Sequence, residues 1–326
     1  IAQTYQNIEI ILVNDGSKDS CGEIIDYYGG RDHRIIPVHK ENGGVSDARN
    51  TGMAYSSGDY TFFVDGDDWI DLTLVKRLVE RIEQDNADIV QTSYYYAYRD
   101  YLLYDERFEK RDDPPTVLDN QQVMKELVVN QIVKNFAWGK LYKTALIRDI
   151  PFQKGIFFED VFWSHLVMQR VDTYVITHEP LYYYYQHAES IVASYSKKNL
   201  DFLQGLKQRH AFLEKYYSHL ADESYKEMVK AHLIHYQLLV RNRKTDSSGM
   251  YRTEIRLYIE KNYARLQKAV AENKELKLDL TLFQFHPSLY ILFLAVKKLL
   301  RIMRLLPRTK GLKRIITDQK DRGVSV

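Results

Sequence analysis

Three carboxylates follow a predicted strand in the segment Tyr60 to Trp69, which reads YTFFVDGDDW. The β-prone residues Thr61 to Val64 predict a short buried strand, and Asp65, Asp67 and Asp68 come directly after it. In an open α/β sheet the ligand crevice lies beyond the carboxyl ends of the strands, and carboxylates gathered there repel one another unless a hard cation joins them. This spacing therefore favours a divalent metal site. The alternative is a surface turn followed by a helix cap.

The elements around this segment alternate between strand and helix, which predicts an α/β fold with a mostly parallel sheet. A near-continuous apolar run, IEIILV, is typical of a strand buried on both faces. Beyond Ser93, a tyrosine-rich charged stretch is interpreted as an excursion over the sheet, and the tyrosines are assigned to packing rather than to the site. The predicted strands are residues 9–13, 34–38, 61–64, 87–92 and 173–176, and the predicted helices include 20–28, 47–55 and 120–130.

Composition and charge limit the class of protein. At 326 residues the chain can bury one large domain or two, and its single cysteine, Cys21, excludes an internal disulfide and fits a reducing compartment. The net charge of +2 is unevenly spread, because ten Lys or Arg and only two Asp follow from Lys297 onward, which leaves residues 1–296 at −6. This asymmetry argues against nucleic-acid binding by residues 1–296 and favours binding of the C-terminal tail to an anionic surface.

The C-terminal part of the chain is helical by its pattern. Residues 199–273 show three amphipathic segments, and a last helix is predicted from Leu289 to Leu306, after Pro287. The first eight residues of that helix are all apolar, well short of the roughly 18 that a membrane span requires. Four cations fall on one arc of it: Lys297, Lys298, Arg301 and Arg304. We expect it to lie in a membrane interface; the alternative is a helix packed on the protein with a solvated basic stripe.

Six short segments follow one another along the chain: VNDGSKD, ENGGVSDARNTG, FFVDGDDW, WGKLY, FFEDVF and YYYQHAESI. In order and spacing they resemble the family 2 glycosyltransferases of the GT-A fold, over about the first 195 residues. The resemblance implies an inverting enzyme that takes a sugar from a nucleotide donor. It also implies a GT-A (Rossmann-like), mostly parallel sheet flanked by helices, followed here by a helical C-terminal region.

The resemblance implies roles for the residues of the donor site. Asp15 matches an aspartate that accepts a hydrogen bond from the nucleotide base, with capping of the next turn as its alternative role. Arg49 matches a basic residue near the nucleotide, and a structural ion pair is its alternative. Asp65 and Asp67 match the DxD motif, in which the first aspartate lies toward the ribose or sugar. The second binds Mn²⁺ or Mg²⁺, which assists departure of the nucleoside diphosphate. Asp68 is expected to start a helix or support the site.

Glu159 and Asp160 resemble the ED pair of the family, whose aspartate is the catalytic base. An inverting transfer needs one carboxylate opposite the leaving group to take the proton of the acceptor hydroxyl, so Asp160 is the expected base and Glu159 is expected to hold the acceptor. The alternative for both is a pair of carboxylates favoured by a helix dipole. By the same resemblance, Lys140 and His187 are expected near the diphosphate, while Trp138 is expected in the core.

One departure from the family pattern concerns its first strand, a Pro-Val-Tyr-Asn type segment that cradles the nucleotide. That segment has no counterpart here, and Ile1 to Tyr5 resembles the end of the helix that follows it. Loss of a central strand would leave backbone groups unpaired. We therefore expect an N-terminally truncated fragment of a longer protein; the alternative is an inactive remnant.

Together these patterns predict three regions: a GT-A domain (1–195), a helical region (196–280) and a basic, membrane-associating tail (281–326). The expected protein is a bacterial-type, metal-dependent hexosyl- or N-acetylhexosaminyl-transferase, cytoplasmic and peripheral on the inner face of the cell membrane. It would move a sugar from a UDP-sugar to a hydroxyl of a growing capsule, cell-wall or lipid-linked glycan, with no nucleic acid as partner. The alternatives are a non-catalytic glycan- or nucleotide-binding remnant and a metal-dependent nucleotidyltransferase, which would release pyrophosphate instead of a nucleoside diphosphate.

Overall fold

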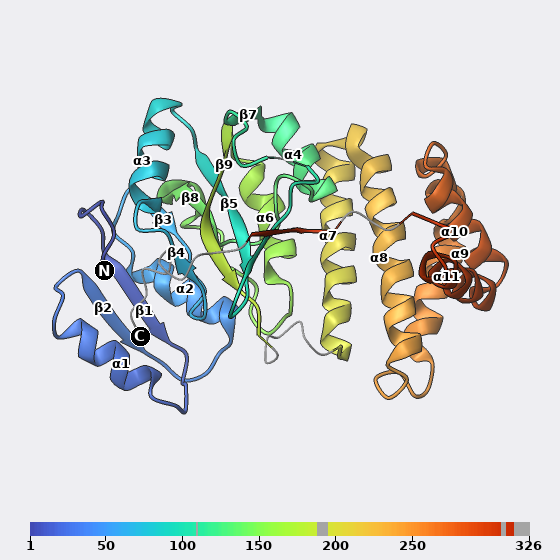
Figure 1. Ribbon diagram of the computed structural model, residues 1–326, viewed down its shortest axis with the longest axis horizontal. Coiled ribbons are helices and arrows are strands. Elements are labelled where there is room, and N and C mark those ends of the chain that lie inside the picture. Colours follow the sequence, from blue (N-terminus) through green and yellow to red (C-terminus); the bar gives the residue numbers. More distant parts are fainter. Residues whose placement is uncertain (109, 188–194, 308–310, 316–326) are drawn as a thin grey trace. The chain divides into compact units, whose positions relative to one another are not determined.

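The computed structural model of the chain describes residues 1–108, 110–187, 195–307 and 311–315 (Figure 1). The chain forms two compact units. The first, here the sheet unit, comprises residues 1–188 with 312–326, and the second, the helical unit, comprises residues 189–311.

The sheet unit begins with a small parallel sheet. Strands β1 (Ile10–Asn14) and β2 (Ile35–His39) pair in parallel, with Ile10 opposite Ile35. Helix α1 (Cys21–Gly29) connects them, and helix α2 (Val45–Tyr55) follows β2. These elements confirm the strands and helices predicted for this part of the chain.

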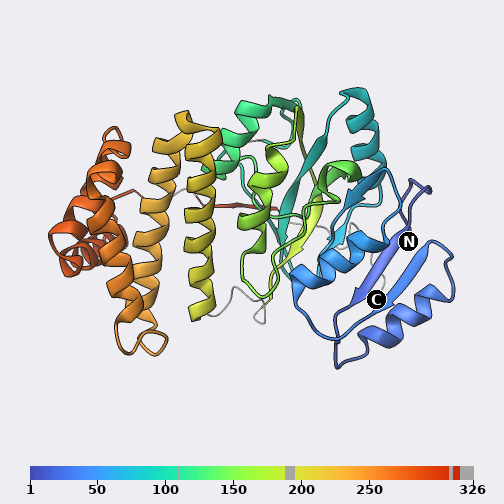
Figure 2. The same ribbon diagram turned by 180° about the vertical axis from the view of Figure 1, so that it is seen from behind.

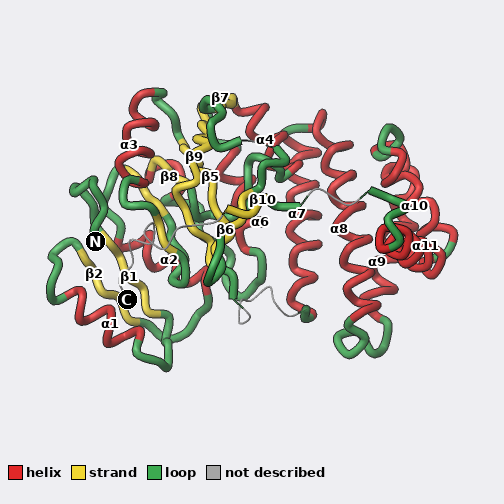
Figure 3. The backbone as a smooth tube through the Cα atoms, viewed as in Figure 1, coloured by secondary structure: helices red, strands yellow, loops and turns green. Residues whose placement is uncertain are grey.

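The larger sheet of this unit has eight strands, shown in yellow in Figure 3. Strand β5 is central, because it pairs with β6 and β8 along one edge and with β9 along the other. Strand β10 pairs with β6, which brings a C-terminal segment into this unit. The bounds are β3 (Tyr60–Phe62), β4 (Trp69–Ile70), β5 (Ile89–Ala97), β6 (Leu102–Tyr104), β7 (Thr116–Asp119), β8 (Lys140–Lys143), β9 (Thr173–Tyr185) and β10 (Lys313–Ile315).

The prediction of a mostly parallel sheet is wrong. Among the described strands, only the pairs β1 with β2 and β5 with β9 run parallel, and the other pairs are antiparallel. The stretch beyond Ser93 is the cause, because β5 continues to Ala97 and turns directly into β6 through a bond from the Tyr98 amide to the Tyr101 carbonyl (2.9 Å). A short turn reverses the chain, whereas a parallel pair needs a long crossover. Strand β8 then enters antiparallel between β3 and β5.

Helices on the sheet supply the core and position the site. Helix α3 (Leu74–Gln84) packs its buried Leu74, Leu78 and Ile82, which are spaced to lie on one helix face, against the sheet. Helices α2 and α6 (Glu159–Met168) lie together on the face of the sheet seen in Figure 2. Helices α4 (Asn120–Val129) and α5 (Thr144–Ile147) also belong to this unit.

The helical unit contains the three predicted amphipathic helices, α7 (Asp201–Tyr216), α8 (Ala221–Arg241) and α9 (Met250–Ala269). Two more follow, α10 (Lys274–Phe285) and α11 (Pro287–Ile302). Helix α11 ends before the predicted Leu306, because Arg304 adopts a left-handed backbone conformation with φ of 60°. Among the described residues, no helix is both long and apolar enough to span a bilayer.

Candidate active site

A single buried arginine joins the end of a strand to the start of a helix. Arg49 of α2 donates from Nη2 to Oδ1 of Asp65, beyond β3, at 2.8 Å, and from Nη1 to Oε1 of Glu159, the first residue of α6. The side chains of Arg49 and Glu159 are only 10% and 12% exposed. Burial opposes the charge of Arg49, but Asp65 and Glu159 outweigh this effect and raise its pKa. The ion pair that we held open as an alternative for Arg49 is therefore present.

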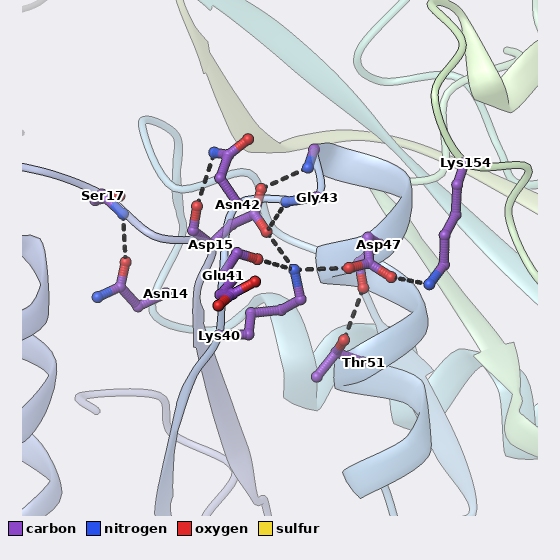
Figure 4. Close-up of polar contacts among 11 residues, drawn as sticks. Asn14, Asp15, Ser17, Lys40, Glu41, Asn42, Gly43, Asp47, Thr51 and Lys154 are labelled. Carbon is purple, nitrogen blue, oxygen red and sulfur yellow. Dashed lines mark hydrogen bonds and ion pairs between the residues drawn. The ribbon is translucent and has the colours of Figure 1, made fainter.

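The carboxylate of Asp15 closes the loop between β2 and α2. It accepts hydrogen bonds from the Gly43 amide (2.9 Å), the Gly44 amide (2.7 Å) and Nζ of Lys40 (2.6 Å) (Figure 4). Burial raises the pKa of Asp15, but these bonds, that of Lys40 foremost, bring it below its usual value. The following turn is instead closed by Asn14, whose Oδ1 accepts from the Ser17 amide.

The two glycines of this loop meet a steric requirement. Gly44 has φ of 81°, a conformation that residues with a Cβ rarely adopt. A Cβ on Gly43 would lie 2.3 Å from Oδ2 of Asp47. The Gly-rich sequence before α2 therefore lets the backbone amides reach Asp15 while Asp47 stays close to the loop.

The DxD segment faces the C-terminal end of β9. Oδ2 of Asp67 lies 2.9 Å from Nε2 of His187, and their side chains are 49% and 30% exposed. Asp68 accepts from the Tyr182 hydroxyl (2.6 Å) and the Tyr185 amide (2.8 Å). Burial raises the pKa of Asp68 to about 6, against the effect of these two bonds. Asp68 thus holds β9 beside the DxD segment, which fits the supporting role expected for it.

Lys140, at the start of β8, lies inside the fold. It is fully buried, and its Nζ donates to the carbonyl of Phe136. Burial lowers the pKa of Lys140 to about 7, although the nearby charge of Asp160 opposes the shift. The same Asp160 charge acts on Arg49, so the four charged groups Arg49, Lys140, Glu159 and Asp160 belong to one region.

Trp138 is a core residue, as predicted. It is 6% exposed and stacks on Phe136 and Tyr182, with ring centroids 3.6 and 4.5 Å away. For Tyr182 the assignment of the tyrosines to packing alone is wrong, because its hydroxyl donates to Asp68 and lies 3.3 Å from the Asp65 amide. A tyrosine within a tyrosine-rich strand gives no local signal of such a contact.

Two side chains of the site could hold a divalent metal together with a bound ligand, although they do not form a complete protein cage. Among the described residues, no group of three or more His, Cys, Asp and Glu could hold a metal ion. Asp67 and His187 nevertheless present an oxygen and a nitrogen donor side by side, whereas Asp65 is engaged by Arg49. A divalent metal that is also bound by a ligand would need only one or two protein donors, and an imidazole suits Mn²⁺ better than Mg²⁺.

Comparison with known proteins shows which family this chain resembles. The family described as Glycosyl transferase family 2 matches residues 1–137. The chain is 39% identical over 194 residues to "Glycosyltransferase GlyA" of Streptococcus pneumoniae, and 32% identical over 229 residues to "Uncharacterized glycosyltransferase EpsJ" of Bacillus subtilis. The chain is similar to the family 2 glycosyltransferases.

These matches cover 56% and 67% of this chain, but only 27% of GlyA and 64% of EpsJ. The fold is shared with S. aureus TarS, solved in complex with UDP-GlcNAc, at a TM-score of 0.58 and 15% identity. That comparison covers 87% of this chain and 77% of the TarS chain. The expected GT-A type of fold, with a sheet flanked by helices and a helical C-terminal region, is thereby confirmed.

We expect the substitution Arg49→Met to lower the free energy of unfolding of the sheet unit by about 3 kcal/mol, because it leaves Asp65 and Glu159 unpaired in a buried site. Urea denaturation measures the change. The triple variant R49M/D65N/E159Q removes the orphaned charges and should recover at least half of the loss.

Arg256→Met is the matched control, since Arg256 pairs with Glu260 on an exposed face of α9 and its loss should cost less than about 1 kcal/mol. If R49M unfolds at the same urea concentration as R256M, the buried arginine does not join the strand to the helix.

Proposed function

We propose that this chain transfers a sugar from a nucleotide-sugar donor to a hydroxyl of a growing cell-surface polysaccharide or lipid-linked glycan, with inversion at the anomeric carbon. One observation carries the proposal. Arg49 holds the strand-end carboxylate Asp65 and the helix-start carboxylate Glu159 on one guanidinium, so the DxD segment and Asp160 belong to one site. The glycosyltransferase names of the relatives support the same reaction class.

The proposed donor is a UDP-sugar. The TarS structures were solved with UDP-GlcNAc and with UDP, and they share this fold. In the proposed complex, Asp15 accepts a hydrogen bond from the base, and its present partners, two loop amides and Lys40, hold its carboxylate in place. Arg49 supplies positive charge and hydrogen-bond donors near the diphosphate, and His187 lies beside Asp67 of the DxD segment.

The proposed reaction is a single displacement. The oxygen of the acceptor hydroxyl bonds to the anomeric carbon, the bond from that carbon to the phosphate oxygen breaks, and its electron pair leaves with the nucleoside diphosphate. Asp160 takes the hydroxyl proton, and Glu159, fixed by Arg49, orients the acceptor. Mn²⁺ or Mg²⁺, held by Asp67 with His187, would supply Lewis-acid stabilisation of the leaving diphosphate, while Asp65 stays paired with Arg49.

Lys140 takes a supporting place in this scheme. Its ammonium group lies inside the fold and donates to a backbone carbonyl. Burial therefore argues against a contact between Lys140 and the donor phosphates. Its charge lies close enough to Asp160 for each to affect the ionisation of the other. We assign Lys140 to stabilising the ionised form of Asp160, which is the form that acts as a base.

Release of UDP from UDP-GlcNAc, with water or an added glycan as acceptor, tests the proposed reaction. We expect the wild-type chain to release UDP and no pyrophosphate, and Asp160→Asn to lower kcat about 100-fold or more, as loss of a general base does. Asp100→Asn, an exposed aspartate of the same unit, should leave the rate unchanged.

Pyrophosphate as the product would identify a nucleotidyltransferase. Tight UDP binding without UDP release would favour the non-catalytic remnant.

We also propose that α11 places the chain on an anionic membrane surface. Its apolar residues lie on the solvent side, where Leu292, Leu299 and Ile302 are 60%, 55% and 69% exposed. Of the four cations predicted on one arc, Lys297 is paired with Glu275 of α10 at 2.5 Å, and Lys298 and Arg301 are exposed. An apolar stripe with cations beside it suits the boundary between lipid headgroups and acyl chains.

Sedimentation with lipid vesicles tests this membrane surface. The double variant L292E/L299E should bind vesicles rich in phosphatidylglycerol roughly 100-fold more weakly than wild type, because two leucine side chains no longer enter the lipid. Leu257→Glu, which changes an exposed leucine of α9 (57%), is the control and should bind as wild type does. Equal binding of the double variant and wild type would show that α11 does not contact lipid.

A further inference from the structure

A short segment, residues 150–154, is held by α2 and is here called the strap. Nδ2 of Asn50 donates to the Phe152 carbonyl, and the Phe152 amide donates to Oδ1 of Asn50, both at 2.8 Å. Two bonds between one side chain and one peptide unit fix the direction of the backbone as well as its distance. Asn50 therefore determines where the strap passes α2.

The strap in turn holds α6. The Phe152 ring stacks on Trp163 of α6, with centroids 4.3 Å apart and an interplanar angle of 18°. Nε1 of Trp163 donates to the Ile150 carbonyl at 2.7 Å. Phe152 and Trp163 are each only 2% exposed, so neither ring can move without a rearrangement of the core. A shift of Phe152 would pass to Trp163, which lies about one helical turn beyond Glu159 and Asp160.

A second contact reaches the strap from the Asp15 side. Lys154 pairs with Asp47, and Oδ2 of Asp47 lies 2.7 Å from Nζ of Lys40 (Figure 4). Nζ of Lys40 also lies 2.6 Å from Asp15. Charges of alternating sign thus run from Asp15 to the end of the strap.

The start of α6 needs such support because the backbone before it is bent. Phe158, the residue that precedes Glu159, has φ of 58°, a left-handed conformation that is costly for an aromatic residue. Gly155 is also left-handed, with φ of 77°. Local preference alone therefore does not favour this course of the chain, and contacts from outside the segment must maintain it.

We propose that Asn50 is a positioning residue for the proposed transfer. Through the strap, Asn50 fixes the position of the first residues of α6, and thereby the position of Asp160 relative to the donor. The ion pair of Asp47 with Lys154 is a second contact that fixes the strap. This inference rests on the proposed function for its chemistry. A purely structural Asn50 would affect stability but would not separate kcat from the KM of the donor.

The kinetic test uses UDP release from UDP-GlcNAc by the full chain. Asn50→Ala should lower kcat roughly 10- to 100-fold, the range expected when a catalytic group is displaced by about 1 Å, with the KM for UDP-GlcNAc within about twofold of wild type. Lys154 is 64% exposed, so Lys154→Met threatens the fold less; it should lower kcat in the same direction, and Lys154→Arg should restore it. Thr51→Ala removes only a bond within α2 and is the control.

Amide hydrogen exchange is a second test of the role of Asn50, and it does not depend on enzymatic activity. In N50A, residues 150–168 should exchange faster than in wild type, while β5 and the helical unit keep their protection. Unchanged exchange in residues 150–168, or an unchanged kcat in N50A, overturns the inference. If the wild-type chain itself releases no UDP, the proposed function fails, and the exchange result alone accepts or rejects the strap as the support of α6.

Discussion

The site depends on a positive charge that is kept out of water. Arg49 is 10% exposed, and the cost of burying its charge is offset by Asp65 and Glu159, which both accept from its guanidinium. A buried arginine without two acceptors would be strongly destabilising, so the pairings constrain three elements at once: the end of β3, α2 and the start of α6. The planar fork of the guanidinium suits this task, since it can reach two carboxylates in fixed directions.

Helix α2 is therefore more than a connection between strands. Its Asp47 meets Lys40 and Lys154, its Arg49 meets the two carboxylates, and its Asn50 meets the Phe152 backbone. One helix thus touches the loop that binds Asp15 and the segment that leads to Asp160. The proposed reaction needs the donor and the base at a fixed distance and orientation. A single rigid helix that contacts both parts of the site can provide this.

Local patterns in the sequence predicted strands β1, β2, β3 and β5 and the start of β9, because apolar runs and helical spacing are properties of neighbouring residues. They did not predict the strands β4, β6, β7, β8 and β10, which are short and depend on pairing with distant segments. The same patterns could not give strand direction, which a short turn at Tyr98 decided. They also could not show that Tyr182 reaches Asp68 or that Asn50 reaches Phe152, 102 residues further on. The resemblance in order and spacing placed Asp65, Glu159 and Asp160 in one site, but the physical link between them, Arg49, appears only in the folded chain.

The most direct test of this account is a calorimetric titration of UDP into the chain and into its Asp67→Ala variant, each with and without Mn²⁺. The account predicts that UDP binds the wild-type chain more tightly when Mn²⁺ is present, and that this gain disappears in the variant. Binding that is the same with and without metal, or equal in the two proteins, would contradict a donor diphosphate site at the end of β3.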